Sequence, residues 1–380
     1  MHISFANSAR SSVGVEWELH LVDVETGELT PAAERLIANT QAGAAGLIHK
    51  EYLPCAIELV SQPRTVIADA IADIEGQLAA LSEAAEPLGV ALLGAGSHPF
   101  SRSAAQVPFR TERYDAVANN NGWWGRQMAI CGTHVHIGVA NLDYVMPLTW
   151  TLARFYPYLL GLSESSPFWE GEDSGFASQR TMMFQQLPTN GLPYRFETWA
   201  QYEDYVDDLV TCGMVTDIQE MRWDVRPSPK YGTVENRIPD SVPTLAELGA
   251  LAALTQCLSE YIERAFDAGD SPDAMPPWLI RENKWRVARY GLDATIIVPG
   301  ESRFRTTPLR EAMGQWINEL MPVADDLGCA RELAFGHEIV ANGASYERQR
   351  RVAAQLGLRG IVDHLIAETS SGVPSWRDGL

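Results

Sequence analysis

The chain has few basic residues, and it lacks both a long apolar run and a recognisable export segment. Its 380 residues include 29 Lys and Arg against 49 Asp and Glu, which gives a formal net charge of −20. A surface this acidic repels nucleic acid and anionic membranes, so neither is expected as a partner. No stretch of 18 or more apolar residues occurs, so no membrane span is expected. The N-terminus has no basic segment followed by an apolar run, so we expect no secretory signal.

Cysteine is scarce, and two nucleotide-binding motifs are missing. The five cysteines are scattered without a Cys-x-x-Cys pair. This usage is typical of reduced thiols, so we expect a cytoplasmic location. The chain has no Gly-x-x-x-x-Gly-Lys-Ser/Thr loop and no Gly-x-Gly-x-x-Gly turn. It is therefore not a P-loop enzyme, and dinucleotide binding is not expected.

What is present is an ordinary globular composition with both strand and helix patterns. Hydrophobic residues make up 46% and charged residues 21% of the chain, as in soluble domains. Apolar residues at steps of three and four predict an amphipathic helix over 65–86. Further helices are expected over 144–163, with a proline interruption, over 244–265 and through most of 307–380. No repeat or linker divides the chain, so we expect one α+β catalytic domain spanning residues 1–380.

The strand pattern around which the chain is organised lies at residues 13–21. Apolar side chains alternate with others there, which is typical of a strand with one face in the core. Glu16 and Glu18 then project from the opposite face, roughly 7 Å apart. Neighbouring carboxylates raise each other's pKa unless a positive charge holds them, and Mg²⁺ or Mn²⁺ commonly does so. Taken alone, such a pair also suits a solvated strand face.

Further extended segments present metal-binding side chains in the same way, opposite an apolar face. These side chains are His134 and His136, then Glu235 with Arg237 beside it, and Glu58. A purely structural protein has little reason to build such a face, because isolated buried charges cost several kcal/mol each. The segments together predict a sheet whose one face is lined by carboxylates, imidazoles and an arginine.

This combination suits ATP chemistry. Divalent ions bridge phosphate oxygens, and arginine neutralises the charge that develops during phosphoryl transfer. Two other functions remain open from the residues alone. One is a metal-dependent amide hydrolase using His134 and His136, although such sites usually recruit further histidines. The other is a non-catalytic relative that binds nucleotide or metal as a sensor or scaffold.

Several motifs, in order along the chain, resemble the bacterial type 2 glutamate–cysteine ligases, which are carboxylate–amine ligases of the glutamine synthetase superfamily. The resemblance runs from about residue 11 to about residue 355. The motifs are Gly14-Val15-Glu16-Trp17-Glu18, residues 51–58, Gly132-Thr133-His134-Val135-His136-Ile137-Gly138-Val139, residues 176–180, residues 233–240 and residues 282–292.

The resemblance implies a glutamine-synthetase-like fold: a curved antiparallel sheet, forming a partial barrel with flanking helices, that holds ATP and two or three Mg²⁺ or Mn²⁺ ions. Carried over by position, Glu18, Glu51 and Glu58 hold one metal. Glu16, His134 and Glu235 hold the other, and His136 and Arg237 lie at the nucleotide phosphates. Glu51 needs a break near Pro54 to turn inward, because a straight strand would put it on the opposite face from Glu58.

The resemblance also implies the reaction. A glutamate side-chain carboxylate attacks the γ-phosphorus of ATP, and the amine of cysteine or a related amine displaces phosphate from the acyl phosphate. Arg237, His136 and Arg226 are the expected catalytic residues. The substrate carboxylates need arginine forks, for which Arg180 and Arg226 are the first candidates.

Three more residues are weaker candidates for substrate contact: Arg289, Asn283 and Arg286. Each could equally serve an ion pair, a cap or packing. The expected partners are small molecules, namely ATP and amino acids. The oligomeric state stays open, since the apolar helix around 245–258 suits either a core or a homodimer.

Overall fold

The computed structural model describes residues 2–44, 46–110, 120–270 and 275–377. Its centre is a seven-stranded sheet in which every pairing is antiparallel. The strand order is β2-β3-β1-β5-β9-β8, and β4 also pairs with β1. The strands are β1 (Val13–Asp23), β2 (Ile48–Lys50), β3 (Ala56–Val60), β4 (Val90–Leu93), β5 (Thr133–Gly138), β8 (Val225–Ser228) and β9 (Thr233–Asn236). The sheet ends at β2 and β8 and does not close into a barrel.

β1 lies in the middle of this sheet, and its alternation is confirmed. Val15, Trp17 and Leu19 are completely buried. Trp17 also donates its indole N–H to the carbonyl of Val242 at 2.9 Å, which satisfies a polar group inside the core. Since successive strand residues face opposite sides, this packing directs Glu16 and Glu18 to the other face.

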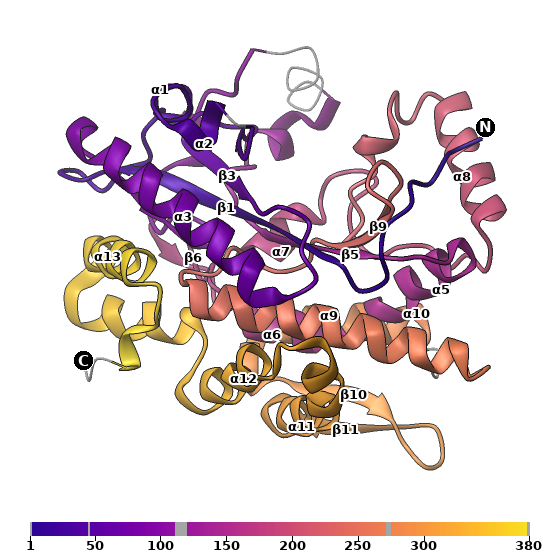
Figure 1. The fold of residues 1–380 in the computed structure, drawn as a ribbon. Helices are drawn as coiled ribbons and strands as arrows, with labels where there is room; N and C mark the ends of the chain where they lie inside the picture. The colour runs from indigo at the N-terminus through magenta and orange to yellow at the C-terminus, as the bar shows by residue number, and fades with distance from the viewer. Residues whose placement is uncertain (1, 45, 111–119, 271–274, 378–380) are drawn as a thin grey trace.

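Helices α3 (Ile67–Ala85) and α9 (Leu245–Asp267) pack against the sheet, and Figure 1 shows α9 running below it. α9 begins at Thr244, whose side chain accepts a hydrogen bond from the N–H of Glu247 at 3.2 Å and so caps the helix. Leu248, Leu251, Leu254 and Leu258 are all fully buried. The apolar side of this helix therefore lies in the core of a single chain.

The helical segment expected over 144–163, with an interruption at Pro157, is two helices in the structure, α5 (Leu142–Ala153) and α6 (Tyr156–Ser163). Pro157 lies in the first turn of α6, where its missing N–H costs no hydrogen bond. The chain therefore breaks just before the proline rather than bending through it.

Three long helices follow near the C-terminus: α11 (Leu309–Leu327), α12 (Ala330–Asn342) and α13 (Ser345–Ser371). A hairpin that the sequence did not predict, β10 (Thr295–Pro299) with β11 (Phe304–Pro308), precedes them. The remaining elements include α1 (Ala33–Ala38), α2 (Gln41–Ala44), β6 (Phe168–Trp169), β7 (Glu172–Asp173), α7 (Gln179–Phe184), α8 (Trp199–Thr211) and α10 (Pro277–Tyr290). Within the described ranges, no helix combines the length and the apolar character that crossing a bilayer requires.

Candidate active site

A cavity of about 650 Å³ opens on the face of the sheet that carries Glu16 and Glu18. Its acidic and imidazole lining comes from β1, β2, β3, β5 and the chain after β2. These side chains are Glu16, Glu18, His49, Glu51, Glu58, His134 and His136. Its basic lining is Lys50, Arg180, Arg222, Arg226 and Arg237. Glu235 does not line the cavity; it is buried beside it, with 1% of its surface exposed.

Strand register explains why these side chains meet. Glu18 stands directly opposite Glu58 on β3, and Glu16 stands opposite His134 on β5. On the next strand pair, His136 stands opposite Glu235. Directly opposite residues in antiparallel strands have Cβ atoms roughly 5 Å apart, so three adjacent pairings concentrate these groups on one face.

The first group consists of Glu18, Glu51 and Glu58, each offering an oxygen within 4.8 Å of the others. Glu51 lies just after β2, before a turn that contains Pro54, and this turn brings it to the other two. Burial, followed by the charge of neighbouring carboxylates, raises the pKa of Glu51 and of Glu58 well above the ordinary value. A bound cation would relieve both effects, and three carboxylates are the oxygen ligands that Mg²⁺ and Mn²⁺ prefer. The donor set therefore fits a hard divalent cation.

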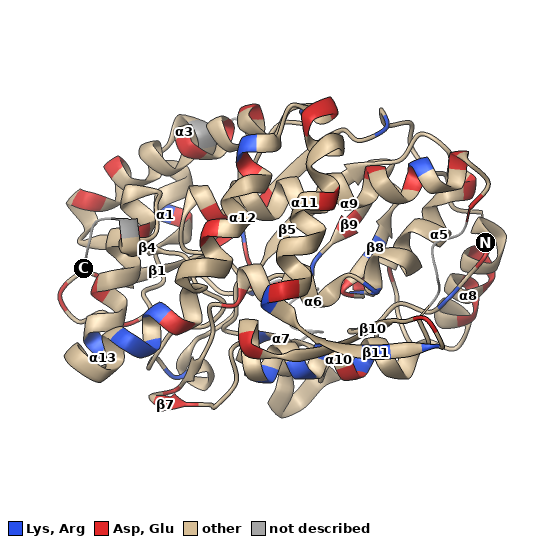
Figure 2. Cartoon of the chain, turned by 90° about the horizontal axis from the view of Figure 1, so that it is seen from below, with Lys and Arg blue, Asp and Glu red and all other residues tan. Residues whose placement is uncertain are grey.

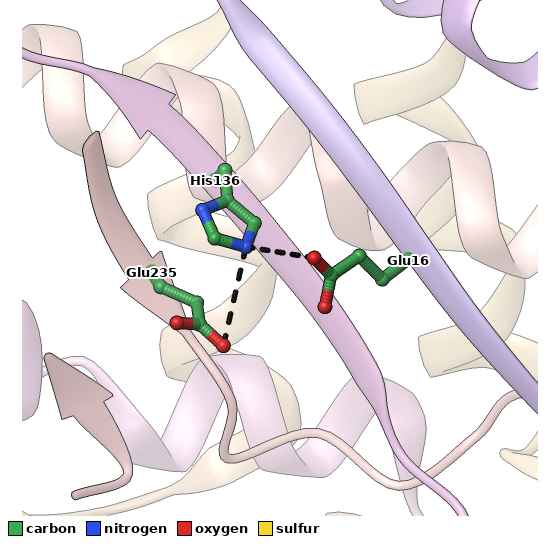
Figure 3. Close-up of side chains that lie close together, drawn as sticks. All are labelled: Glu16, His136 and Glu235. Carbon is green, nitrogen blue, oxygen red and sulfur yellow. Dashed lines mark hydrogen bonds and ion pairs between the residues drawn. The ribbon is translucent and has the colours of Figure 1, made fainter. Parts of the chain in front are cut away.

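A second group gathers around Glu16 (Figure 3). The Nε2 atom of His136 lies 3.1 Å from Glu16 and 3.9 Å from Glu235. The Nδ1 atom of His134 lies 3.0 Å from the other oxygen of Glu16. Glu16 thus forms possible metal-binding groups with His136 and Glu235, and with His134 and Glu58.

This grouping differs from the expected set of Glu16, His134 and Glu235. Among the groups that the described residues form, none holds His134 and Glu235 together. The reason is the β5–β9 register, which puts His136 rather than His134 opposite Glu235. His136, expected at the nucleotide phosphates, stands here in the metal-binding arrangement.

Glu235 is held by two arginines. Arg226 pairs with it at 2.7 Å, and Arg237 pairs with its other oxygen. Burial alone would raise the pKa of Glu235, but the charges of Arg226 and Arg237 outweigh burial and lower it. For His136, burial favours the neutral ring, yet Glu16 and Glu235 raise its pKa. Glu235 is therefore an ionised carboxylate that orients two arginines toward the cavity.

Arg180 also reaches the cavity, although only 3% of it is exposed. Its guanidinium donates to the carbonyls of Ile238, at 3.1 Å, and Arg237, at 3.3 Å. Its Nε has no hydrogen-bond partner in the part of the chain that the structure describes. The guanidinium occupies the space that a Cβ on Gly132 would need, which explains a glycine just before β5.

Three expected substrate residues are not brought to the cavity. All three belong to α10. The amide of Asn283 exchanges hydrogen bonds with the backbone of Ile297 at 2.7 and 2.8 Å. Arg286 bonds to Glu282 and to a backbone carbonyl, and Arg289 bonds to the carbonyl of Gly175. These contacts fix α10 against its neighbours.

Sequence reasoning missed several lining residues, including Lys50, Arg222, Tyr52 and Tyr231. They lie in loops or at strand ends, where no periodic pattern marks a side chain as inward-facing. Lys50 immediately precedes Glu51, so its place beside the acidic motif was the one available signal.

Comparison with solved structures identifies the class of fold. A glutamate–cysteine ligase of Francisella tularensis, solved with AMP, matches with a TM-score of 0.65 over 98% of this chain and 95% of that one, at 13% identity. A bifunctional glutathione synthetase of Pasteurella multocida matches with a TM-score of 0.67 at 14% identity, over 95% of this chain. Our chain spans about half of that protein, 52%. The fold is thus α+β and glutamine-synthetase-like, the fold of these ligases.

Sequence comparison identifies the family within this class of fold. The model of glutamate–cysteine ligase family 2 matches residues 12–367, and the chain belongs to this family. A protein of Arthrobacter sp. (strain FB24), provisionally named glutamate–cysteine ligase 2-1, is 46% identical over 98% of this chain and 99% of its own length. A provisionally named glutamate–cysteine ligase 2 of Mycobacterium tuberculosis (strain ATCC 25177 / H37Ra) is 46% identical over 96% of this chain and 97% of its own length.

Proposed function

We propose that the protein is an ATP-dependent carboxylate–amine ligase that joins the side-chain carboxylate of glutamate to the amine of cysteine. One observation carries the proposal. Three converging carboxylates, Glu18, Glu51 and Glu58, share a cavity with arginines from the other edge of the sheet, such as Arg226 on β8. This polarity suits a magnesium-bound triphosphate next to an anionic amino acid. Family membership supports the same reaction class.

The acidic groups are the proposed metal ligands. Glu18, Glu51 and Glu58 would hold one Mg²⁺ or Mn²⁺, and Glu16 with His134 would hold another. Glu235 is already neutralised by two arginines, so the need for a cation is greater at the first group. When bound, the ions neutralise phosphate oxygens and screen the triphosphate from the carboxylates.

The chain's own cations would act on the phosphoryl group as it moves. Arg237 and Arg226, aligned by Glu235, offer N–H donors to oxygens whose charge grows in the transition state. His136, with its raised pKa, offers a further N–H donor. Arg180 would hold a substrate carboxylate, to which a guanidinium can pair with two parallel hydrogen bonds.

The proposed reaction has two steps. A carboxylate oxygen of glutamate attacks the γ-phosphorus, and the bond to the β-phosphate oxygen breaks, giving an acyl phosphate and ADP. The neutral amine attacks the acyl carbon, the carbon–oxygen bond to phosphate breaks, and the amine loses a proton. The cavity walls, which include apolar side chains such as Phe184 and Leu187, would limit water access to the acyl phosphate.

The test is ADP release by purified protein with ATP, Mg²⁺, glutamate and cysteine, with mass spectrometry of the product. We expect stoichiometric ADP, phosphate and dipeptide. If ADP appears only with another amine, that amine replaces cysteine as the proposed substrate and the reaction class stands. If no amino-acid pair yields ADP, the ligase assignment is overturned. The metal-dependent hydrolase alternative has no observation in its favour, because the metal-binding groups of the described residues contain no histidine besides His134 and His136.

A further inference from the structure

A second cavity, of about 220 Å³, lies away from the catalytic face. Its walls come from the junction of α5 and α6, from α10, from the β10–β11 hairpin and from α11. It shares no lining residue with the larger cavity. In Figure 1 the hairpin and α11 lie below α9, whereas β1 and β3 lie above it. The two cavities are therefore separate sites.

The charged lining of this second cavity has one sign. Among its lining residues, the charged side chains are Arg154 and Arg305, and none is Asp or Glu. In a chain with a net charge of −20, a cavity without an acidic wall is unusual. Figure 2 shows blue, basic segments on α10 and next to β11, with red, acidic segments among them. The local potential therefore favours an anion.

The Arg305 side chain is available to bind an anion. It lies on β11, opposite Val298, and its side chain is exposed. Its guanidinium forms no hydrogen bond or ion pair with another residue in the described ranges. Arg154, whose guanidinium lies 4.9 Å from the centre of the Phe155 ring, supplies a second positive charge on the same cavity.

Aromatic and aliphatic side chains form the rest of the wall. Trp316 packs edge-on against Phe155 and against Tyr158, with ring centres 5.0 and 6.2 Å apart. Burial raises the pKa of Tyr158 to about 12, and the charge of Glu319 adds to this rise, while the indole of Trp316 and the charges of Arg154 and Arg305 oppose it. Both guanidinium groups thus act on one phenol at the aromatic wall, which places the positive charge next to the apolar surface.

We propose that this cavity binds a small organic carboxylate whose body is a single ring or a short apolar group. Arg305 would pair with the carboxylate, and the charge of Arg154, which has a partner of its own in the protein, would add to the attraction. The aromatic wall would contact the body of the ligand, and a guanidinium over an aromatic ring adds a cation–π contribution. The cavity has about a third of the volume of the larger one, about 220 against about 650 Å³, which suits a one-ring acid better than a nucleotide.

The test is calorimetric titration of the full-length protein with benzoate, with benzamide as the neutral analogue and with inorganic phosphate as an anion without a ring. Arg305→Glu reverses the charge at the cavity, and Arg305→Lys retains it without the planar fork. The matched control is Arg303→Glu, which makes the same charge change on the same hairpin at a residue that does not line the cavity. Circular dichroism and thermal unfolding confirm that each variant folds.

We expect benzoate to bind wild type and Arg303→Glu within about twofold of each other. Arg305→Glu should weaken binding by roughly tenfold or more, with Arg305→Lys intermediate, and benzamide should bind at least about tenfold more weakly than benzoate. Absence of benzoate binding, or binding that Arg305→Glu leaves unchanged, would overturn the site. Phosphate binding as tight as benzoate binding would overturn the assignment of an organic ligand.

Discussion

Two buried acidic clusters in this molecule are built in opposite ways. On the face that carries the candidate site, Glu18, Glu51 and Glu58 converge. The basic side chains that pair with them are imidazoles: His49 lies 3.2 Å from Glu58, and His134 lies 3.6 Å from Glu18. Between α9 and α13, Arg348 pairs with Glu247 and with Glu368, each at 2.8 Å, and all three side chains are at most 2% exposed. The second cluster therefore has a guanidinium paired directly with its carboxylates, whereas the first has imidazoles as its paired basic groups.

The pKa shifts express this difference. Burial, then neighbouring carboxylates, raises the pKa of Glu51 and Glu58. Burial acts in the same direction on Glu368, but Arg348 and His364 outweigh it and lower the pKa of Glu368 to about 2. The pKa of Glu247, the second carboxylate of this cluster, is raised, because burial and the charge of Glu368 outweigh Arg348 there. Carboxylates that the chain neutralises itself contribute to stability, and carboxylates left without a cation are available to bind one.

The largest expected effect tests whether the catalytic cluster serves turnover. Glu16→Ala removes the carboxylate that both His134 and His136 contact, so ADP release should fall on the order of 10³-fold or more, about 4 kcal/mol in activation free energy. Steady-state ADP release measures it. Glu83→Ala, on the exposed side of α3, is the control and should keep wild-type turnover. Near-normal turnover of Glu16→Ala would show that Glu16 is not needed for the reaction.

The second test breaks the complete cluster. Arg348→Met leaves Glu247 and Glu368 buried without their cation, so the free energy of unfolding should fall by about 3–5 kcal/mol. Urea unfolding measures this loss. Arg351→Met, an exposed arginine on the same helix, should change stability by less than about 0.5 kcal/mol. Equal losses in the two variants would contradict a stabilising role for the buried pairs.

The third test uses pH. Because the pKa of Glu368 is about 2 in the folded protein against an ordinary 4.5, its contribution to stability is fully present above pH 4.5. It is lost as the pH falls towards 2, and its size is on the order of 3 kcal/mol. The stability difference between wild type and Glu368→Gln should shrink over this window. Comparing the two proteins isolates Glu368 from Glu247 and His364, which face it. A constant difference would contradict the shift.

The smallest expected effect is a gain in stability on mutation rather than a loss. Without divalent ions, Glu51→Gln should stabilise the protein by about 1 kcal/mol, because it removes one of three mutually repelling carboxylates. With saturating Mg²⁺, wild type should gain more stability than the variant, because ligand binding stabilises only the state that binds. Thermal unfolding with EDTA and with Mg²⁺ measures both. If the metal-free variant is less stable than wild type, Glu51 has a structural role like that of Glu368.

Some of the site was predictable from local pattern. The alternation in residues 13–21 predicts that Glu16 and Glu18 share a face, and the structure brings both to the cavity. Which of His134 and His136 lies beside Glu235 was not predictable, because this depends on which residue of β5 stands opposite Glu235 in the sheet. Asn283, Arg286 and Arg289 share a motif with the family, yet α10 uses them to hold its neighbours.

Local pattern was enough to predict the α+β class, the family and the strand faces on which acids and histidines lie, because a period of two is a local property of the chain. The folded chain was needed to show which of those groups meet, that Glu235 pairs with two arginines, and that a second cavity is lined by arginines. Such facts depend on strand register and helix packing between residues far apart in sequence, and no local pattern encodes those distances.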